Sequence, residues 1–529
     1  MAIGVDVARP GLVARALVSG VQVLALATVL GFSLPRGFPL DDAWIHQVVA
    51  RVFAETGVLG FDPSLPGSGA TSLLWTLLLS SNAALLHVAP PLFTTLLAGA
   101  CLLGVGQLFY VLAISDGLTP GKAVLGAVAF GASGNVVWFA TSGMEVTLAM
   151  LLALTAVCAF FRDASPRSAG VAGVALVLLF YTRPETALLG LLLAVARRRG
   201  VRDTALLLGP LALGVGAYAV LNVVHTGHLV PVTFQGRRWL AEVGLLGATP
   251  TDVAWVLSQQ WFDRLAEYTL GTPSPVVFFP VLGLALYGVY GLAMERRWRL
   301  LTLCGWALLH TLSYVALLPS IGHGGRYQPF VPGIFCLGAV FGALRLGECV
   351  AARMPRPWGS AAAYAAVVPL AFGMTSAVRA WGEANALAVR HEDETEVAMA
   401  RDVAALPRGA VVASFDIGAM GYYSGRSIED LGGLVRPDIV PFLRDGRTVE
   451  WLRKIKATHL VLPLGYRSDL PEPFNFGEIL GVFGSPDLRL SALADHQTPL
   501  LPWLGGVRAT SSSAPRQRLY RIIWQRGAP

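Results

Sequence analysis

Apolar stretches long enough to cross a membrane recur along this 529-residue chain. A helix needs about 20 mostly apolar residues to span the roughly 30 Å of hydrocarbon in a bilayer. Because several such stretches follow one another, the sequence predicts a polytopic α-helical membrane protein with about 11 transmembrane helices. Seven stretches are clear and four less regular: 16–34, 92–115, 204–224, 276–294, 300–318, 327–344 and 359–378, then 73–89, 123–141, 146–161 and 169–196.

Composition supports a membrane environment. Only 14% of the residues are charged and the mean hydropathy is +0.59, whereas soluble domains have about a quarter charged residues. The formal net charge of +7 does not indicate nucleic-acid binding, because the excess arginines lie in short loops without an RNA-binding pattern around them. The five cysteines lie in or beside apolar segments, so the sequence predicts neither a disulfide framework nor a zinc motif.

Arginines in the short loops predict the orientation, because cytoplasmic loops of membrane proteins keep Lys and Arg. Arg9 and Arg15 place the N-terminus in the cytoplasm, and basic clusters at 197–202, 296–299 and 345–356 lie on the same side under an eleven-span count. The C-terminal residues then lie outside the cytoplasmic membrane. Two arginines conflict with this count unless residues 169–196 form a short hairpin with its tip at 182–185: Arg162 and Arg167.

Polarity divides the chain into two predicted domains. Residues 1–378 form a transmembrane domain with outer loops at 35–72 and 225–275, and residues 379–529 form a small extracytoplasmic α/β domain. In the second domain we expect strands at 410–415, 459–462 and 518–524, a hairpin-like segment at 422–426 and a helix at 449–456. This domain lacks a glycine-rich phosphate-binding fingerprint, which argues against a nucleotide site.

The first outer loop contains two adjacent acids, Asp41 and Asp42, at the start of a predicted amphipathic helix along the membrane surface. One interpretation is N-capping, because carboxylates are favourable at a helix N-terminus. Another is that one carboxylate takes a proton from a hydroxyl group or holds a cation. His46 lies four residues after Asp42, so both side chains could reach a divalent metal.

Charged residues also interrupt apolar runs at Glu145, Arg183 and Glu185. Such charges are costly in lipid, so we expect them to face a cavity or one another. An interhelical Arg and Glu pair and a ligand role remain equally open.

Two outer segments combine basic residues with aromatic or glycine residues. Arg237 and Arg238 precede Trp239, a pattern that suits an anionic lipid head group, although Trp239 also fits a plain interfacial anchor. The segment 322–327 contains His323 and Arg326, and its glycines let the backbone and the arginine approach a phosphate closely.

The order of these motifs resembles the GT-C superfamily of membrane glycosyltransferases, in particular bacterial relatives of the mycobacterial terminal arabinofuranosyltransferase. The resemblance covers most of the chain and depends on six motifs: Asp41-Asp42-Ala43-Trp44-Ile45-His46, Thr71-Ser72-Leu73-Leu74-Trp75-Thr76, Ser142-Gly143-Met144-Glu145, Arg183-Pro184-Glu185, Arg326-Tyr327 before Pro329, and Asp416-Ile417-Gly418 leading to Gly421-Tyr422-Tyr423. Relatives tend to have Pro-Asn-Thr-Phe where this chain has Pro231-Val232-Thr233-Phe234, and its C-terminal domain is shorter than theirs.

The resemblance implies a transferase that moves a sugar, with inversion, from a polyprenyl phosphate to an envelope glycan, lipid or protein outside the cytoplasmic membrane. Asp41 or Asp42 is then the general base on the acceptor hydroxyl. The other implied site residues are the phosphate contacts Arg183, Arg237, Arg238 and Arg326, the cleft residues His46, Glu145, Glu185, His323 and Tyr327, and the ligands of a divalent metal in some relatives, here Asp42, His46 and Glu145.

Two other functions fit parts of the sequence. A transporter or flippase of lipid-linked sugars would use Arg183 and Glu185 in its pathway, although we find no inverted repeat of the kind that transporters show. A non-catalytic envelope assembly protein would bind glycan through its outer domain.

Overall fold

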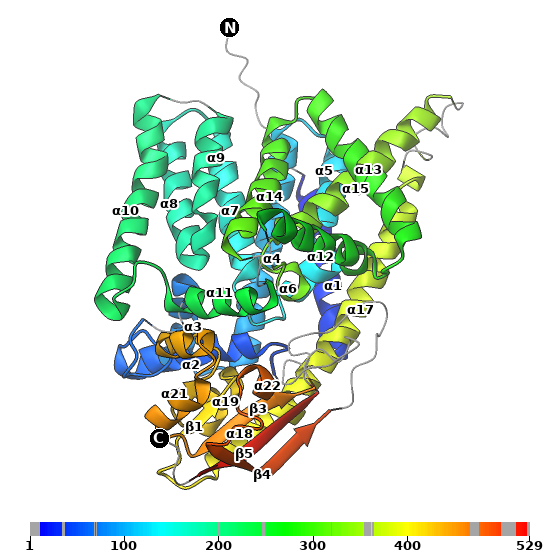
Figure 1. Cartoon of the computed structure of the whole chain (residues 1–529). Helices are drawn as coiled ribbons and strands as arrows, with labels where there is room; N and C mark the ends of the chain where they lie inside the picture. Colours follow the sequence, from blue (N-terminus) through cyan, green and yellow to red (C-terminus); the bar gives the residue numbers. More distant parts are fainter. Residues whose placement is uncertain are drawn as a thin grey trace.

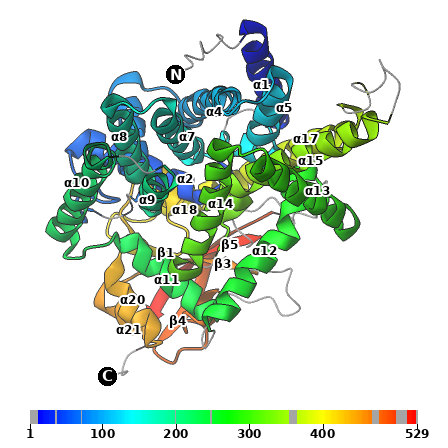
Figure 2. The ribbon, with the colours of Figure 1, turned by 90° about the horizontal axis from the view of Figure 1, so that it is seen from above.

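The chain forms a bundle of long helices with a β-sheet against one end of it (Figure 1). We call that end of the bundle the sheet end. In both views α10 and α13 lie on opposite sides of the bundle (Figure 1, Figure 2). The computed structural model describes residues 11–33, 37–67, 69, 71–197, 200–245, 249–318, 320–353, 361, 364–465, 476–498 and 515–525.

The bundle is built from the apolar segments of the sequence. Among the described residues, five helices are long and apolar enough to cross a membrane: α1, α4, α10, α13 and α15. The total of about 11 spans stays a prediction. The helices of the bundle are α1 (Leu12–Phe32), α4 (Pro90–Ser115), α5 (Pro120–Gly131), α6 (Gly134–Phe139), α7 (Val146–Arg162), α8 (Pro166–Thr182), α9 (Leu188–Ala196), α10 (Val201–Thr226), α12 (Pro250–Leu270), α13 (Pro275–Met294), α14 (Trp298–Leu317), α15 (Phe330–Ala351) and α17 (Val368–Glu392).

Basic residues gather at the end of the bundle away from the sheet, which we call the basic end. Arg15 in the first turns of α1 donates a hydrogen bond of 2.8 Å to Gln107 near the end of α4, so these two helices run antiparallel. Asp116, directly after α4, accepts from the backbone N–H of Leu300 at the start of α14 at 3.0 Å. Arg345 of α15 pairs with Glu295 at 3.0 Å. Of the predicted basic clusters, Arg198, Arg199 and Arg356 lie outside the described residues.

Residues 169–196 form two helices rather than one. α8 ends at Thr182, Arg183 is extended, and the 3₁₀-helix η2 (Pro184–Ala187) leads into α9. Cys158, near the end of α7, contacts the carbonyl of Leu108 near the end of α4, so α7 and α4 end at the same side of the bundle. Arg162 therefore lies at the basic end, as the hairpin alternative requires.

The apolar segment 73–89 does not cross the bundle, in contrast to our prediction. It folds as α3 (Leu73–Ser81) and the π-helix η1 (Asn82–Leu86). Ser72 before it bonds to the carbonyl of Thr182, and Thr94 after it accepts from Gln47 of α2 (Asp41–Thr56), so both of its ends lie at the sheet end. Its helical part is too short for the membrane, because 14 helical residues cover only about 21 Å.

The C-terminal residues form a five-stranded mixed sheet in the order β2-β1-β3-β5-β4. β1 is parallel to β2 and β3, whereas β5 is antiparallel to β3 and β4. The strands are β1 (Val412–Ser414), β2 (Ile428–Asp430), β3 (His459–Leu464), β4 (Leu488–Gln497) and β5 (Arg516–Trp524), and the short helices are α18 (Ala398–Ala404), α19 (Gly418–Ser424), η5 (Pro437–Ile439), α20 (Val440–Arg444), α21 (Thr448–Lys454) and α22 (Phe476–Ile479).

Two expectations for this region change. The segment 422–426 is not hairpin-like: it ends helix α19, and Gly425, with φ 63°, is the left-handed residue that closes it. At the predicted domain boundary α17 runs unbroken through residue 378 as far as Glu392, and the π-helix η4 (Asp393–Val397) follows it directly. One continuous helix therefore joins the bundle to the sheet.

Helix α2 lies between the bundle and the sheet instead of along a lipid surface. Its residues 43–50 are all buried, on both faces, because α3 packs on one side and α19 on the other. Trp44 contacts the rings of Phe38, Tyr422 and Tyr423. Arg51 donates to the carbonyls of Gly421 and Tyr422 at 3.1 and 3.0 Å. The first turn of α2 is thus fixed from both layers.

Glycines set the contact between α13 and α15. A Cβ at Gly342 would collide with the backbone of Leu284, and one at Gly288 would collide with the backbone of Gly338.

We expect Gly342→Leu to lower the thermal unfolding temperature in detergent strongly, since overpacking a tight contact costs about 1–3 kcal/mol or more. Gly283→Leu is the control, because that glycine on α13 has open space around it. Equal unfolding temperatures for the two variants would contradict the packing argument.

Candidate functional site

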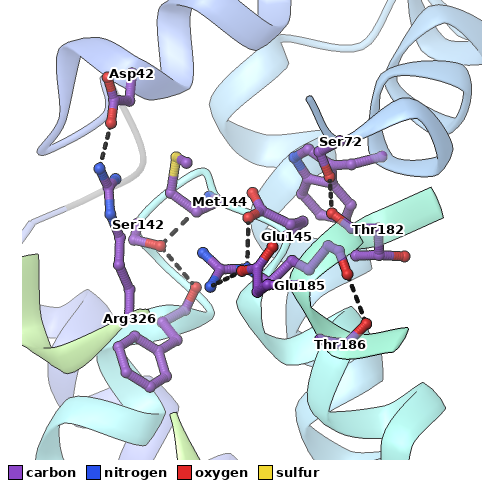
Figure 3. A network of polar contacts seen from close by, with 12 residues as sticks. Asp42, Ser72, Ser142, Met144, Glu145, Thr182, Glu185, Thr186 and Arg326 are labelled. Carbon is purple, nitrogen blue, oxygen red and sulfur yellow. Dashed lines mark hydrogen bonds and ion pairs between the residues drawn. The ribbon is translucent and has the colours of Figure 1, made fainter. Parts of the chain in front are cut away.

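Asp42 faces two arginines at the sheet end of the bundle. Arg326 donates through Nη2 to Asp42 Oδ2, and Nη2 of Arg237 lies 3.6 Å from the same oxygen. Figure 3 shows Asp42 reaching from α2 toward Arg326, which follows the 3₁₀-helix η3 (His323–Gly325). Arg237 comes from α11 (Val232–Leu245), so three separate segments meet here.

The loop before Arg326 depends on its glycines. Gly322, Gly324 and Gly325 have φ values of 68°, 64° and 80°, a region that favours glycine. A Cβ at Gly324 would meet the ring of Trp138, and one at Gly325 would meet the ring of Trp261. This tight turn directs Arg326 back toward α2.

The charges around Asp42 control its ionisation. Burial acts to raise its pKa, but the charges of Arg326 and Arg237 outweigh burial and hold the pKa of this carboxyl below its usual value. Burial and the charge of Arg326 lower the pKa of His323 to about 4, so this imidazole is neutral at pH 7. Asp42 is therefore a carboxylate at neutral pH, held by cations.

Arg326 has N–H groups that its partner Asp42 does not bind. Its side chain is 2% exposed, and neither Nε nor Nη1 has a hydrogen-bond partner among the described residues. Buried donors are rarely left unpaired, because their desolvation costs about 1–3 kcal/mol. A guanidinium with unused N–H groups matches the fork-like binding of carboxylate or phosphate oxygens.

Tyr327 lies among three arginines. The guanidinium carbons of Arg326, Arg237 and Arg183 are 5.3, 5.5 and 5.7 Å from its ring centroid. An aromatic face attracts cations, so this ring stabilises like charges that would otherwise repel one another. The Tyr327 ring also stacks on that of Tyr314, with the ring centroids 5.5 Å apart.

Arg183 forms a buried network with Glu145 and Glu185, the two acids that Figure 3 labels side by side. Its Nε donates to Glu145 at 2.9 Å and its Nη1 to Glu185 at 3.4 Å. Tyr314 also donates to Glu185, at 2.8 Å. The interhelical pair that the sequence suggested is thus present, and two of the predicted cleft residues serve as its acids.

The suggested metal ligands do not come together as one set. His46 Nε2 lies 3.6 Å from Glu145 Oε2, but Glu145 is engaged by Arg183, while Asp42 is engaged by Arg326. Within the described part of the chain, one group of three His, Cys, Asp or Glu residues has ligand atoms close enough together to share an ion, and it does not contain Asp42, His46 or Glu145. The residues present here fit an arginine-based anion site better than a metal site.

Asp41 has a different environment from its neighbour. Its two carboxylate oxygens accept the backbone N–H groups of Gly418 and Ala419, at 2.8 and 2.7 Å, at the start of α19. Asp41 therefore joins α2 to the sheet layer, and only Asp42 of the predicted pair faces the arginines.

The side chains of Arg237 and Arg238 face different sides of α11. Arg237 is partly buried and points to Asp42, whereas Arg238 is exposed. Trp239 is 3% exposed and packs with Ile439 and Val440 of the C-terminal region, so it is not a lipid anchor. A Cβ at Gly236 would meet the carbonyl of Gly433 at 2.5 Å, which shows how closely the sheet layer supports this helix.

Several residues of the site were not predicted. Tyr314 has no distinguishing signal, because it is one of several hydroxyl-bearing residues in the apolar helix α14. Of the two backbone amides that bind Asp41, that of Gly418 belongs to the motif Asp416-Ile417-Gly418 and that of Ala419 follows it, but the fold alone reveals their partner.

We expect Glu145→Gln to lower the unfolding temperature clearly, because it leaves Arg183 with less compensation in a buried site, where breaking an ion pair costs about 3–5 kcal/mol. Arg183→Met in the same chain should restore part of the loss. A double-mutant cycle of thermal unfolding in detergent measures this coupling. Additive effects of the two substitutions would contradict a direct pair.

Comparison with known proteins gives three results. A family model, Domain of unknown function (DUF8728), matches residues 385–488. A search of the curated proteins gave no match. Among solved structures, the chain is similar to the oligosaccharyltransferase of Archaeoglobus fulgidus, with a TM-score of 0.51, 13% identity and coverage of 85% of this chain and 70% of that one.

It is also similar to ArnT from Cupriavidus metallidurans bound to undecaprenyl phosphate, with a TM-score of 0.51, 15% identity and coverage of 95% of this chain and 97% of that one. At these identities the likeness concerns the fold, so the chain shares its fold with these two proteins. These matches do not confirm the specific likeness to the arabinofuranosyltransferases.

Proposed function

We propose that this protein is a membrane glycosyltransferase that moves a sugar from a polyprenyl phosphate donor to a hydroxyl of an envelope glycan, lipid or protein. One observation carries the proposal: Arg326 is buried beside Asp42, and two of its nitrogens, Nε and Nη1, have no hydrogen-bond partner among the described residues. The GT-C fold supports it, since the ArnT that shares this fold was crystallised with undecaprenyl phosphate.

The donor phosphate binds Arg326 and Arg237 in this proposal. Both guanidinium groups lie against Tyr327 and reach the same oxygen of Asp42. A phosphate offers more negative charge than one carboxylate and accepts forked hydrogen bonds from arginine. Donor binding thus draws the arginines away from Asp42 and leaves that carboxylate free for the acceptor.

Asp42 then acts as the general base. The acceptor oxygen attacks the anomeric carbon, the bond from that carbon to the phosphate oxygen breaks, and Asp42 takes the hydroxyl proton. The electron pair leaves with the polyprenyl phosphate, whose growing charge Arg326 and Arg237 stabilise. Attack from the face opposite the leaving phosphate inverts the anomeric configuration.

The Arg183 network acts as support in this scheme. Arg183 pairs through Nε with Glu145 and through Nη1 with Glu185, so the contribution that we propose for it at the donor site is its charge beside Tyr327. His46, against Glu145, belongs to the same wall of the cleft.

We propose that the basic end faces the cytoplasm, because Arg15, Arg162 and Arg345 lie there. The site and the sheet then lie on the outer side of the cytoplasmic membrane. The N-terminus is cytoplasmic, and residues from about 393 onward form the extracytoplasmic domain.

Asp42→Asn should reduce transfer of sugar from purified polyprenyl phosphate donor by at least a hundredfold, because general-base catalysis contributes about 10²–10⁴ in rate. Expression should stay close to wild type, whereas the unfolding temperature should fall, because the buried Arg326 loses the carboxylate that it pairs with. The assay is therefore run well below the unfolding temperature of the variant. Glu55→Gln, on the exposed end of α2, is the matched control and should keep full activity. Full activity of Asp42→Asn in a radiolabelled transfer assay would refute the proposal.

Arg326→Lys and Arg237→Lys should weaken donor binding, since lysine cannot make forked hydrogen bonds to phosphate. We expect a rise in the donor KM of roughly tenfold or more for each, from the loss of one charge-assisted hydrogen bond. Arg238→Lys is the control on the exposed side of α11. If all three variants have the same donor KM, Arg326 and Arg237 do not bind the donor phosphate.

A further inference from the structure

A second group of acids lies buried on the other side of the first turn of α2. Asp41, Glu392 and Glu396 each direct one carboxylate oxygen into a space in which all three oxygens lie within 4.8 Å of one another. The three residues come from α2, the end of α17 and the π-helix η4. The group therefore spans the junction between the bundle and the sheet layer.

Glu396 is a buried acid whose carboxylate has no hydrogen-bond donor among the described residues. Its exposed fraction is 0%, and neither of its carboxylate oxygens accepts a hydrogen bond from a donor in the described part of the chain. An ionised carboxylate in such a place is very costly unless a cation or a proton neutralises it.

The strongest charges acting on Glu396 are themselves acidic. They belong to Glu392, Asp416 and Asp41. Asp41 accepts two backbone N–H groups and Asp416 accepts a hydrogen bond from Gln517 at 2.6 Å, whereas Glu396 has acidic neighbours and no donor among the described residues.

We infer that Asp41, Glu392 and Glu396 bind a divalent cation. Two oxygen ligands on opposite sides of Ca²⁺ lie about 4.8 Å apart, twice a metal–oxygen distance of roughly 2.4 Å. The spacing of the three oxygens therefore allows each to reach one ion. A set made only of carboxylate oxygens selects hard cations such as Ca²⁺, Mg²⁺ or Mn²⁺ over Zn²⁺ or Cu²⁺.

The hydrogen bonds of Asp41 leave room for this ligand. Each of its oxygens accepts one backbone N–H group from α19, and a carboxylate has about four acceptor positions in all. Asp41 can thus hold α19 and the cation at once. The π-helix η4 inserts an extra residue into the helical path, a feature that often occurs at functional sites.

The cation fastens α2 to the end of α17 and, through Asp41, to α19. Asp42 is the next residue on α2, so an ion here also fixes the helix turn from which the proposed base projects. Cation binding itself does not depend on the proposed transferase function.

The test uses the full-length protein in detergent, stripped with EDTA and returned to Ca²⁺, Mg²⁺ or Mn²⁺ alone. We expect about one bound ion per chain by elemental analysis and a saturable rise of the unfolding temperature by several degrees with the preferred cation. Glu396→Gln and Glu392→Gln should each lose most of the bound ion and of this rise. Glu394→Gln is the matched control, because this neighbour in η4 is exposed and pairs with Arg390.

The opposite result is equally clear. Three results together would overturn the inference: the stripped protein binds none of the three cations, EDTA does not change its unfolding temperature, and Glu396→Gln unfolds at a higher temperature than wild type. In that case protons, and not a metal ion, neutralise the group. Should Glu396→Gln fail to fold, cation titration of the wild-type protein alone decides, since absence of binding overturns the inference. Loss of sugar transfer with intact cation binding would count only against the proposed function.

Discussion

The structure depends on how charge is buried around the first turn of α2. Asp41 and Asp42 are neighbours in sequence, yet one binds backbone amides of α19 and the other binds Arg326. Buried carboxylates are tolerated only where donors or cations meet them. Each aspartate therefore fixes a different layer, and the orientation of this helix turn is determined from the sheet on one side and from the bundle on the other.

Three arginines and three acids of the site form a group whose positive and negative charges are equal in number. Arg183, Arg237 and Arg326 surround Tyr327, and Asp42, Glu145 and Glu185 pair with them. A balanced group costs less to bury than any of its members alone. An anionic substrate would compete with Asp42 for Arg237 and Arg326, as the proposed phosphate site requires.

The sequence predicted the membrane class, the positions of most helices and three strands of the sheet, because hydropathy and strand patterns are local properties. It failed at 73–89, where apolarity alone does not distinguish a crossing helix from one packed beside α2. It proposed Asp42, Arg237 and Arg326, which the structure brings together, but it also proposed Arg238, which is exposed. Neighbouring positions on a helix differ by about 100° in direction, and only the packing of Trp239 fixes which arginine turns inward.

The unbroken course of α17 has a mechanical consequence. This helix passes from the bundle to Glu392, where η4 begins, without a flexible joint. Residues of one continuous helix move together, so a change in the tilt of α17 moves Glu392, at its end, relative to Asp41 on α2. The geometry of this acidic group therefore follows the orientation of α17 within the bundle.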